Sequence, residues 1–192
     1  MIKLIGPEKV KTAVFISGVG SNLKNLINFS SKKKSPINIK LVVSNKENAK
    51  GLKHANQSKI KKVIINFKTQ KKAEKKTLYF LKKNKIELIC LAGFMKILSK
   101  NFLKRFKGKI INIHPSLLPK YKGLNTHKKA LENNEKFSGC TVHYVTSKLD
   151  SGKIILQKKV KIKKNDTENS LKKKILKEEH ALYIKAINKI FN

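Results

Sequence analysis

Short apolar runs alternate with helical patterns along almost the whole chain, and this alternation predicts the class of fold. The apolar runs have the length of strands, and polar or glycine-containing segments separate them. The predicted strands are residues 11–17, 37–44, 62–67, 86–92, 109–114, 138–146 and 153–162. Helices are expected after Gly20, where Leu23, Leu26 and Ile27 recur at helical spacing, and over residues 46–57, 69–84, 99–106, 126–133 and about 166–190.

The order of these elements predicts an α/β protein with a single domain. Repeated strand–helix alternation is typical of a doubly wound, mostly parallel sheet with helices on both faces. Residues 153–162 alternate apolar and polar side chains near their end, which predicts an antiparallel edge strand towards the C-terminus. With 192 residues, the chain can form one substantial core. We assign residues 11–192 to this domain and residues 1–10 to an N-terminal extension of unknown role.

A glycine turn between the first strand and the first helix is a candidate anion site. Gly18, Val19 and Gly20 follow the strand directly, and Ser21 and Asn22 open the helix. Glycines let backbone amides approach a ligand, and a helix N-terminus carries partial positive charge. Many strand–helix junctions have such a turn for packing alone, so the turn by itself leaves both interpretations open.

A polar pair at the end of the fifth predicted strand is the second candidate site. Asn112 and His114 lie two residues apart, so they project from one face of the strand while Ile113 points the other way. Pro115 cannot donate to a sheet and should end the strand at His114. Open α/β sheets bind ligands at the carboxyl ends of their strands. A histidine near a strand end is, however, often no more than a hydrogen-bonded structural residue.

Lysine dominates the composition and gives the chain a formal net charge of +35. A charge of this size favours binding to nucleic acid or another polyanion. Arg105 is nevertheless the only arginine, whereas nucleic-acid readers commonly use arginine forks and aromatic platforms. We therefore interpret the lysine excess as drift towards A/T-rich codons on a solvated surface, with no specific nucleic-acid partner.

The sequence offers no pattern typical of a membrane protein, a secreted protein or a metal site. No apolar run reaches the roughly 18 residues that span a bilayer, and residues 1–10 lack a secretory signal. Cys90 and Cys140 lie in apolar runs without metal-ligand spacing. They are expected to be reduced thiols inside a cytoplasmic protein that needs no metal.

Five motifs resemble those of the folate-dependent formyltransferases, which use 10-formyltetrahydrofolate as formyl donor. They are SGVGSNL from Ser17, LAGFMKIL from Leu91, NIHPSLLPKYKG from Asn112, LDSG from Leu149 and KEEHALY from Lys177. The resemblance runs from about Thr12 to the C-terminus and implies a Rossmann-like formyltransferase fold. Three positions depart from the family pattern: Val19 stands where Asn is commonest, Lys96 stands where Arg is frequent, and Ser147 stands where acidic residues are common.

The resemblance implies a reaction of purine biosynthesis and three groups of site residues. In that reaction the formyl group of 10-formyltetrahydrofolate passes to the amine of 5-phosphoribosylglycinamide. The implied catalytic residues are Asn112, His114 and Asp150; those that bind the ribonucleotide are Gly20, Ser21, Asn22, Leu23 and Glu179; and those that bind the folate are Met95, Lys96, Ile97, Leu98, Asn112 and Thr146. His143 is expected to be structural or to line the folate pocket.

Other functions remain open at this level. Methionyl-tRNA formyltransferase and formyltetrahydrofolate hydrolase share the Asn–His–Asp residues. The first would carry a C-terminal RNA-binding domain and the second an N-terminal regulatory domain, and neither is expected here. The non-enzymatic alternative is a basic protein that binds polyanions and has an enzyme fold without the enzyme's activity. The presence of Asn112, His114 and Asp150 together argues against it. The expected partners are small molecules, and the expected assembly is a monomer or a homodimer.

Overall fold

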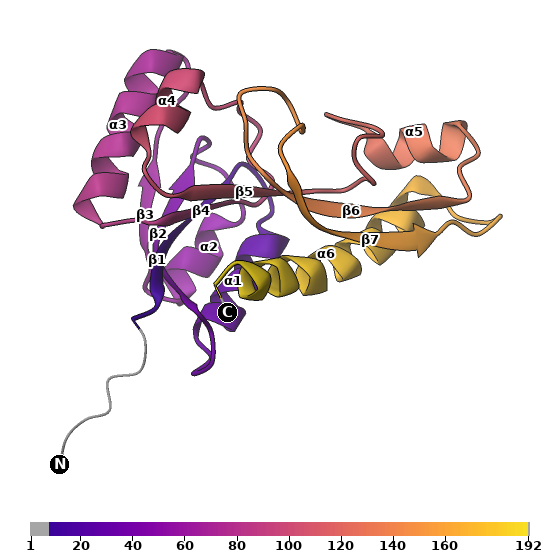
Figure 1. Cartoon of the computed structure of the whole chain (residues 1–192), viewed down its shortest axis with the longest axis horizontal. Coiled ribbons are helices and arrows are strands. Elements are labelled where there is room, and N and C mark those ends of the chain that lie inside the picture. The colour runs from indigo at the N-terminus through magenta and orange to yellow at the C-terminus, as the bar shows by residue number, and fades with distance from the viewer. Residues whose placement is uncertain (1–7, 192) are drawn as a thin grey trace.

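One seven-stranded sheet forms the centre of the molecule (Figure 1). The computed structural model describes residues 8–191. In that range the strand order is β3-β2-β1-β4-β5-β6-β7. Strands β1 to β5 run parallel to one another, β6 runs antiparallel to β5, and β7 runs antiparallel to β6. The strands are β1 (Val10–Ile16), β2 (Ile37–Ser44), β3 (Lys61–Ile64), β4 (Leu88–Leu91), β5 (Lys109–His114), β6 (Phe137–Tyr144) and β7 (Ile154–Lys161). The predicted α/β class and the antiparallel edge strand are confirmed.

Helices cover both faces of the sheet, as the alternation of elements predicted. They are α1 (Ser21–Ser30), α2 (Leu52–Gln57), α3 (Gln70–Lys83), α4 (Lys100–Arg105), α5 (Thr126–Glu132) and α6 (Glu168–Phe191). Successive residues of β1 supply the two faces, because side chains of a strand alternate. Val14 and Ile16 pack in the core that contains α1, α2 and α6, whereas Ala13 and Phe15 pack in the core that contains α3 and α4.

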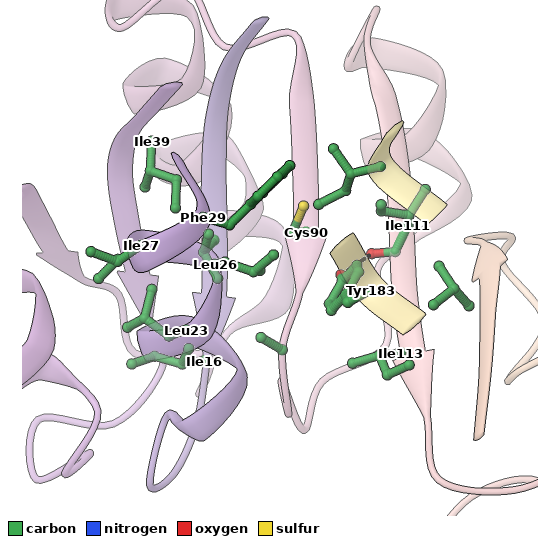
Figure 2. Packing of buried hydrophobic residues seen from close by; sticks show 14 of the residues in the cluster. Ile16, Leu23, Leu26, Ile27, Phe29, Ile39, Cys90, Ile111, Ile113 and Tyr183 are labelled. Atoms are coloured by element: carbon green, nitrogen blue, oxygen red, sulfur yellow. Dashed lines mark hydrogen bonds between the residues drawn. The ribbon is translucent and has the colours of Figure 1, made fainter. Parts of the chain in front are cut away.

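Tyr183 fastens α6 to the middle of the sheet (Figure 2). Its side chain is fully buried, and its hydroxyl contacts the carbonyl oxygens of Leu91 at 3.0 Å and Ile111 at 3.3 Å. These carbonyls belong to β4 and β5, which are neighbours in the sheet. The helix that carries Glu179 is therefore anchored beside the carboxyl end of β4 and the middle of β5.

Two predicted boundaries were wrong by three or more residues, each for a different reason. The strand expected over 62–67 ends at Ile64, yet Ile65 and Phe67 are buried in the core and produce the same pattern. The helix expected over 46–57 begins only at Leu52. Before it, Gly51 N donates to Gly18 O at 2.9 Å, which holds this segment as a turn against the first loop.

The buried side of α6 is broad. Leu171, Ile175, Glu179, Leu182 and Ala186 are buried. Tyr183 and Ile187 are buried as well, whereas Ile190 is only partly buried. Because α6 lies against both the sheet and α1, its buried face is wider than a single stripe.

The N-terminal boundary is only partly visible. The predicted extension, residues 1–10, lies mostly outside the described residues, and β1 begins at Val10.

The sheet order places the candidate residues at a topological switch point. From β1 the chain moves outwards to β2 and β3 and then returns to add β4 on the other side of β1. Ligands bind outside the carboxyl ends of the strands at such a point. The glycine turn follows β1, the LAGFMKIL segment follows β4 and His114 ends β5, so three adjacent strands deliver the three motifs to one edge.

Candidate active site

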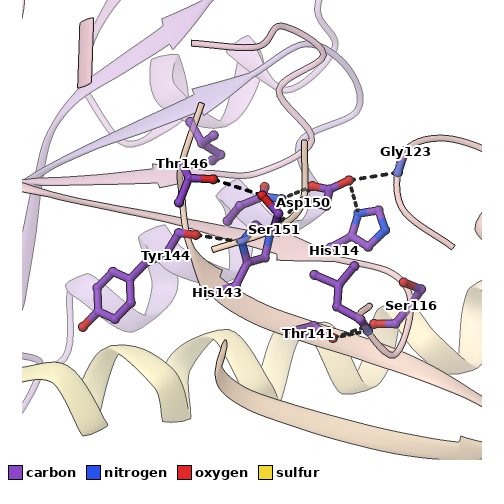
Figure 3. A network of polar contacts seen from close by, with 12 residues as sticks. His114, Ser116, Gly123, Thr141, His143, Tyr144, Thr146, Asp150 and Ser151 are labelled. Atoms are coloured by element: carbon purple, nitrogen blue, oxygen red, sulfur yellow. Dashed lines mark hydrogen bonds and ion pairs between the residues drawn. The ribbon is translucent and has the colours of Figure 1, made fainter. Parts of the chain in front are cut away.

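The end of β5 and the loop before β7 bring the three predicted catalytic residues together. Figure 3 shows His114 and Asp150 facing each other. His114 Nδ1 lies 3.4 Å from Asp150 Oδ2, with side-chain exposures of 6% and 10%. Asn112 Nδ2 lies 3.5 Å from Asp150 Oδ1. Few waters can separate such buried groups, so their charges and dipoles act on one another strongly. The catalytic roles of the three residues stay predictions.

The backbone around Asp150 is shaped to point its carboxylate at β5. Asp150 has φ 42, a left-handed conformation that is uncommon for a residue other than glycine. Gly123 N donates to Asp150 Oδ2 at 2.9 Å. Two residues further on, a Cβ at Gly152 would lie 1.7 Å from Tyr144 O, so this position requires glycine. Both constraints fix the Asp150 side chain before any ligand binds.

Both ring nitrogens of His114 face oxygen acceptors. His114 Nε2 lies 2.9 Å from Tyr121 O, a carbonyl that can only accept. On the other side, the ring faces the Asp150 carboxylate through Nδ1 at 3.4 Å. Only an imidazole protonated at both nitrogens donates to both groups. Both sides of the ring are therefore fixed by oxygen acceptors of the protein.

His143 determines how the amide of Asn112 is oriented. It stands opposite Asn112 in the antiparallel pair of β5 and β6. Its Nδ1 donates to Tyr144 O at 2.9 Å, and its Nε2 then accepts from Asn112 Nδ2 at 3.2 Å. Burial lowers the pKa of His143 below its ordinary value, against the opposing effects of Tyr144 O and Asp150. A neutral His143 therefore directs the Asn112 NH₂ group towards Asp150.

A small cavity of about 70 Å³ opens beside this cluster and contains most of the predicted folate residues. Apolar side chains such as Leu91, Leu98 and Val145 form part of its wall, and Asn112, Asp150 and Thr146 add polar groups. Lys96 and Ile97 also line it. Met95 is not among the described residues that line it. An apolar slot with a few polar groups suits a flat heteroaromatic ring.

The segment that follows β4 is held by side chains from the loop after β1 and from α3. Met95 N donates to Ser17 Oγ at 2.8 Å, so this amide is already engaged. Gln70 Nε2 donates to Ile97 O at 3.0 Å and to Glu74 Oε1 at 3.0 Å. Glu74 Oε1 also accepts from Ser99 N at 2.8 Å. The backbone groups of Lys96 and Leu98 are the better candidates to contact the folate ring, because Met95 N and Ile97 O already have partners within the protein.

The glycine turn has the close backbone approach that an anion site needs. Gly20 has φ 77, and a Cβ there would lie 2.6 Å from Gly51 Cα. The first amides of α1 have no partner within the helix and point into the turn. Val19 is 67% exposed, whereas the side chain of Leu23 is fully buried. Of these residues, Leu23 can reach a ligand only through its backbone.

Two predicted ribonucleotide residues meet although 157 positions separate them. Asn22 Nδ2 donates to Glu179 Oε2 at 2.8 Å. Both are buried, and Asn22 Oδ1 has no hydrogen-bond partner among the described residues. Burial raises the pKa of the Glu179 carboxyl above its ordinary value, and the hydrogen bond from Asn22 opposes the rise. Unpaired buried acceptors are costly, which marks the pair as a place for a ligand that donates hydrogen bonds.

The candidate site is identified by its lining residues and not by the volume of its cavity. A larger hollow of about 850 Å³ lies at the amino ends of the strands, where Val10, Glu87 and Lys109 line it. It contains none of the predicted site residues. No group of three or more His, Cys, Asp and Glu suited to a metal occurs in residues 8–191. Over the same range, no helix has the length and hydropathy of a membrane span.

A buried Asn–His–Asp cluster at the switch point of a doubly wound sheet is the arrangement that the sequence motifs implied. The family model described as formyl transferase matches residues 10–187 of this chain. The chain therefore belongs to the formyl transferase family, and the predicted family resemblance is confirmed.

Proteins of named function are similar to this chain in sequence and in structure. The phosphoribosylglycinamide formyltransferase of Haemophilus influenzae is 41% identical over 176 residues, which are 90% of this chain and 83% of that protein. The crystal structure of phosphoribosylglycinamide formyltransferase from Brucella melitensis has a TM-score of 0.90 and 39% identity, and covers 95% of this chain and 96% of the other. The trifunctional purine biosynthetic protein adenosine-3 of Gallus gallus is 44% identical over 186 residues, but the chain spans only 18% of its length.

Sequence reasoning missed two contributors to the site. Tyr121 supplies only its carbonyl to His114, and Gly123 supplies only its amide to Asp150, so their side chains gave no signal. His143 was expected to be structural or to line the folate pocket, and it lines the cavity; its contact with Asn112 followed only from the register of β5 and β6. The position of Tyr121 and Gly123 in the Pro- and Gly-rich loop was the available hint.

Proposed function

We propose that this chain transfers the formyl group of 10-formyltetrahydrofolate to the amine of 5-phosphoribosylglycinamide, a reaction of purine biosynthesis. The observation that carries the proposal is the buried contact of His114 and Asp150 beside Asn112, with the Asn22–Glu179 pair at the neighbouring loop. The first group suits acyl transfer, and the second suits a substrate that offers N–H donors. The relatives named above support the choice of substrate.

Asn112 and His114 stabilise the negative charge that develops on the formyl oxygen. The attacking amine forms a new N–C bond, and the bond between the formyl carbon and N10 of the folate breaks. Donors aimed at developing charge often supply the largest single contribution to catalysis. Asn112 Nδ2 and His114 Nε2 are both donors that now contact protein acceptors. During transfer the formyl oxygen becomes an additional acceptor for these donors, and the protein acceptors keep them in position.

Asp150 holds the ring of His114 and helps to move one proton. The amine loses a proton as it attacks, and N10 of the folate gains one as it leaves, so the proton count balances. A carboxylate within hydrogen-bond reach, directly or through water, can accept and return that proton.

Each substrate has a separate place at the carboxyl edge of the sheet. The phosphate binds at the amides of Ser21 to Leu23, where the helix N-terminus favours an anion. Glu179 accepts from the glycinamide. The folate ring enters the cavity beside Leu98, which must widen, because about 70 Å³ is well below the roughly 300 Å³ of usual ligand pockets. A cytoplasmic location and a monomeric or homodimeric assembly stay predictions.

A formyl-transfer assay tests this function against its alternatives. Purified protein and 10-formyltetrahydrofolate are incubated with 5-phosphoribosylglycinamide, with methionyl-tRNA or without an acceptor, and the deformylated folate is measured. Turnover that requires the ribonucleotide supports the proposal. Turnover with methionyl-tRNA alone, hydrolysis without an acceptor, or no turnover at all would each reject it.

A further inference from the structure

A single loop controls the acceptors on both sides of the His114 ring. This segment, residues 115–123, is called the Tyr121 loop here. Tyr121 O lies 2.9 Å from His114 Nε2, and Gly123 N donates to the Asp150 carboxylate that faces His114 Nδ1. Any shift of the Tyr121 loop therefore changes the environment of both ring nitrogens.

The carbonyl of Tyr121 is held in place through its own side chain. Tyr121 has φ 54, so its carbonyl points in a direction that an ordinary backbone conformation would not give. The Tyr121 hydroxyl donates to Glu135 Oε1 at 2.8 Å. Lys120 Nζ reaches the same oxygen at 2.7 Å. The Glu135 carboxylate thus binds two successive residues of the loop, Lys120 and Tyr121.

Neighbouring groups hold both the backbone and the carboxylate of Glu135 in place. It follows α5, and Glu135 N donates to Ala130 O at 3.0 Å, which ties its backbone to the helix. The hydrogen bonds from Lys120 and then Tyr121 hold the pKa of the Glu135 carboxyl below its ordinary value. The bond to Glu135 raises the pKa of the Tyr121 phenol. At neutral pH an ionised carboxylate accepts from a neutral phenol, the stronger kind of hydrogen bond.

The N-terminal half of the loop has an independent anchor. Ser116 Oγ donates to Lys120 O at 2.7 Å, and Thr141 Oγ1 donates to Ser116 O at 2.6 Å. Thr141 lies on β6, so this anchor belongs to the sheet. Loss of Glu135 should therefore free the Tyr121 carbonyl without unfolding the loop.

We propose that Glu135 is a positioning residue for formyl transfer: it holds Tyr121 so that the Tyr121 carbonyl orients the His114 ring towards Asp150. The proposal rests on the function proposed above, because it assigns Glu135 a part in the same reaction. Glu135 itself contacts neither substrate. Without it, the ring turns about its side-chain bonds, and fewer molecules present Nε2 to the formyl oxygen.

Matched variants separate positioning from a general structural effect. Glu135→Gln and Tyr121→Phe remove the two ends of the hydrogen bond, and Glu132→Gln removes a comparable carboxylate that pairs with Lys128 on the exposed side of α5. We expect both test variants to lower kcat about tenfold, which corresponds to about 1.4 kcal/mol. KM for the ribonucleotide should stay within twofold, and Glu132→Gln should match the wild type. Equal kcat in all four proteins, or a loss confined to KM, would overturn the proposal.

A double-variant cycle tests whether Glu135 acts through His114. In a His114→Asn background, Glu135→Gln should change the residual rate less than twofold, because the ring that it positions is gone. A second tenfold loss in that background would show that Glu135 acts elsewhere.

A substrate-free measurement keeps this proposal distinct from the proposed function. The ¹⁵N chemical shift of His114 Nε2 is read by NMR at one fixed pH, with His114→Asn used for assignment. The titratable groups that act on His114, namely Asp150, His127 and His143, are unchanged in every variant. Glu135→Gln and Tyr121→Phe should move this signal to the position of a more weakly hydrogen-bonded nitrogen, and Glu132→Gln should not. An unmoved signal overturns the positioning role even if formyl transfer is confirmed, whereas a moved signal in a protein without transferase activity rejects only the proposed reaction.

Discussion

At the residue scale, the charge of Asp150 acts directly on the ring of His114. Replacing Asp150 with Asn keeps the size of the side chain and removes the charge that faces His114 at 3.4 Å. We expect kcat to fall by roughly two or more orders of magnitude, the usual scale of lost acid–base help. The KM of the ribonucleotide should hardly change, because its phosphate binds at a different loop. Steady-state kinetics of formyl transfer measure both values.

We expect His114 and Asp150 to act as one unit, which non-additive losses would show. His114→Ala in the Asp150→Asn background should cost much less than His114→Ala alone. Fully additive losses, or normal turnover of Asp150→Asn, would contradict the assignment of this pair to the catalytic centre.

Glu179 should reduce stability while it serves binding. Burial raises the pKa of this carboxyl, so the folded state keeps the proton to a higher pH than the unfolded state does. The free energy of unfolding therefore falls as pH rises above the ordinary value of 4.5. Glu179→Gln keeps an acceptor for Asn22 without the charge, and its Tm should exceed that of the wild type at pH 7. The two Tm values should converge below the ordinary carboxyl pKa.

The same variant should bind its substrate less well. We expect the KM for the ribonucleotide to rise at least tenfold, because a charged acceptor contributes more than a neutral one. Unchanged affinity would remove Glu179 from the binding site, and a lower Tm at pH 7 would contradict the burial argument.

At the scale of elements, the turn between β1 and α1 depends on the contact between two glycines. Gly20 has φ 77, and its added Cβ would meet the Gly51 backbone at 2.6 Å, whereas a Cβ at Gly18 meets nothing within 4 Å. Gly20→Ala should lower the free energy of unfolding by about 1–2 kcal/mol from the left-handed backbone alone. It should also raise the KM of the ribonucleotide more than tenfold, since the amides move. Chemical denaturation and kinetics measure the two effects.

The neighbouring positions provide the controls for this turn. Gly18→Ala should be close to neutral in stability, and Val19→Asn should change KM only modestly, because Val19 is exposed and backbone amides make the contact. A Val19→Asn effect as large as that of Gly20→Ala would argue for binding by side chains.

At the scale of the whole molecule, the charge of +35 should be separable from catalysis. Lys32, Lys33, Lys34, Lys71 and Lys72 are exposed and absent from the candidate site. Changing all five to Gln should leave kcat/KM within about twofold. Any binding to DNA should weaken steeply with salt, by a slope of roughly −0.9 for each phosphate contact, without sequence preference. Sequence-specific binding that survives 0.2 M salt would contradict the interpretation of the lysines as drift.

The sequence by itself determined the features that neighbouring residues control. Pro115 ends β5 because it lacks a donor, Gly20 permits the tight turn because it lacks a Cβ, and alternation of apolar residues separates strands from helices. Asn112 and His114 share a face of β5 because strand geometry allows nothing else. The class of fold and one edge of the site were therefore predictable, and the motifs supplied the family.

Only the tertiary structure decided which groups meet across the chain. His143 faces Asn112 through the register of an antiparallel pair, and Asn22 meets Glu179 across 157 positions. The acceptors that face His114 are the carbonyl of Tyr121 and the carboxylate of Asp150. Glu135 is connected to the first of them through the Tyr121 hydroxyl. Such contacts depend on strand register and on how α6 and the loops pack against the sheet, which are sums over many distant residues. No short stretch of sequence contains that information, and this is why the carboxylate of Glu135 gave no signal before the fold was known.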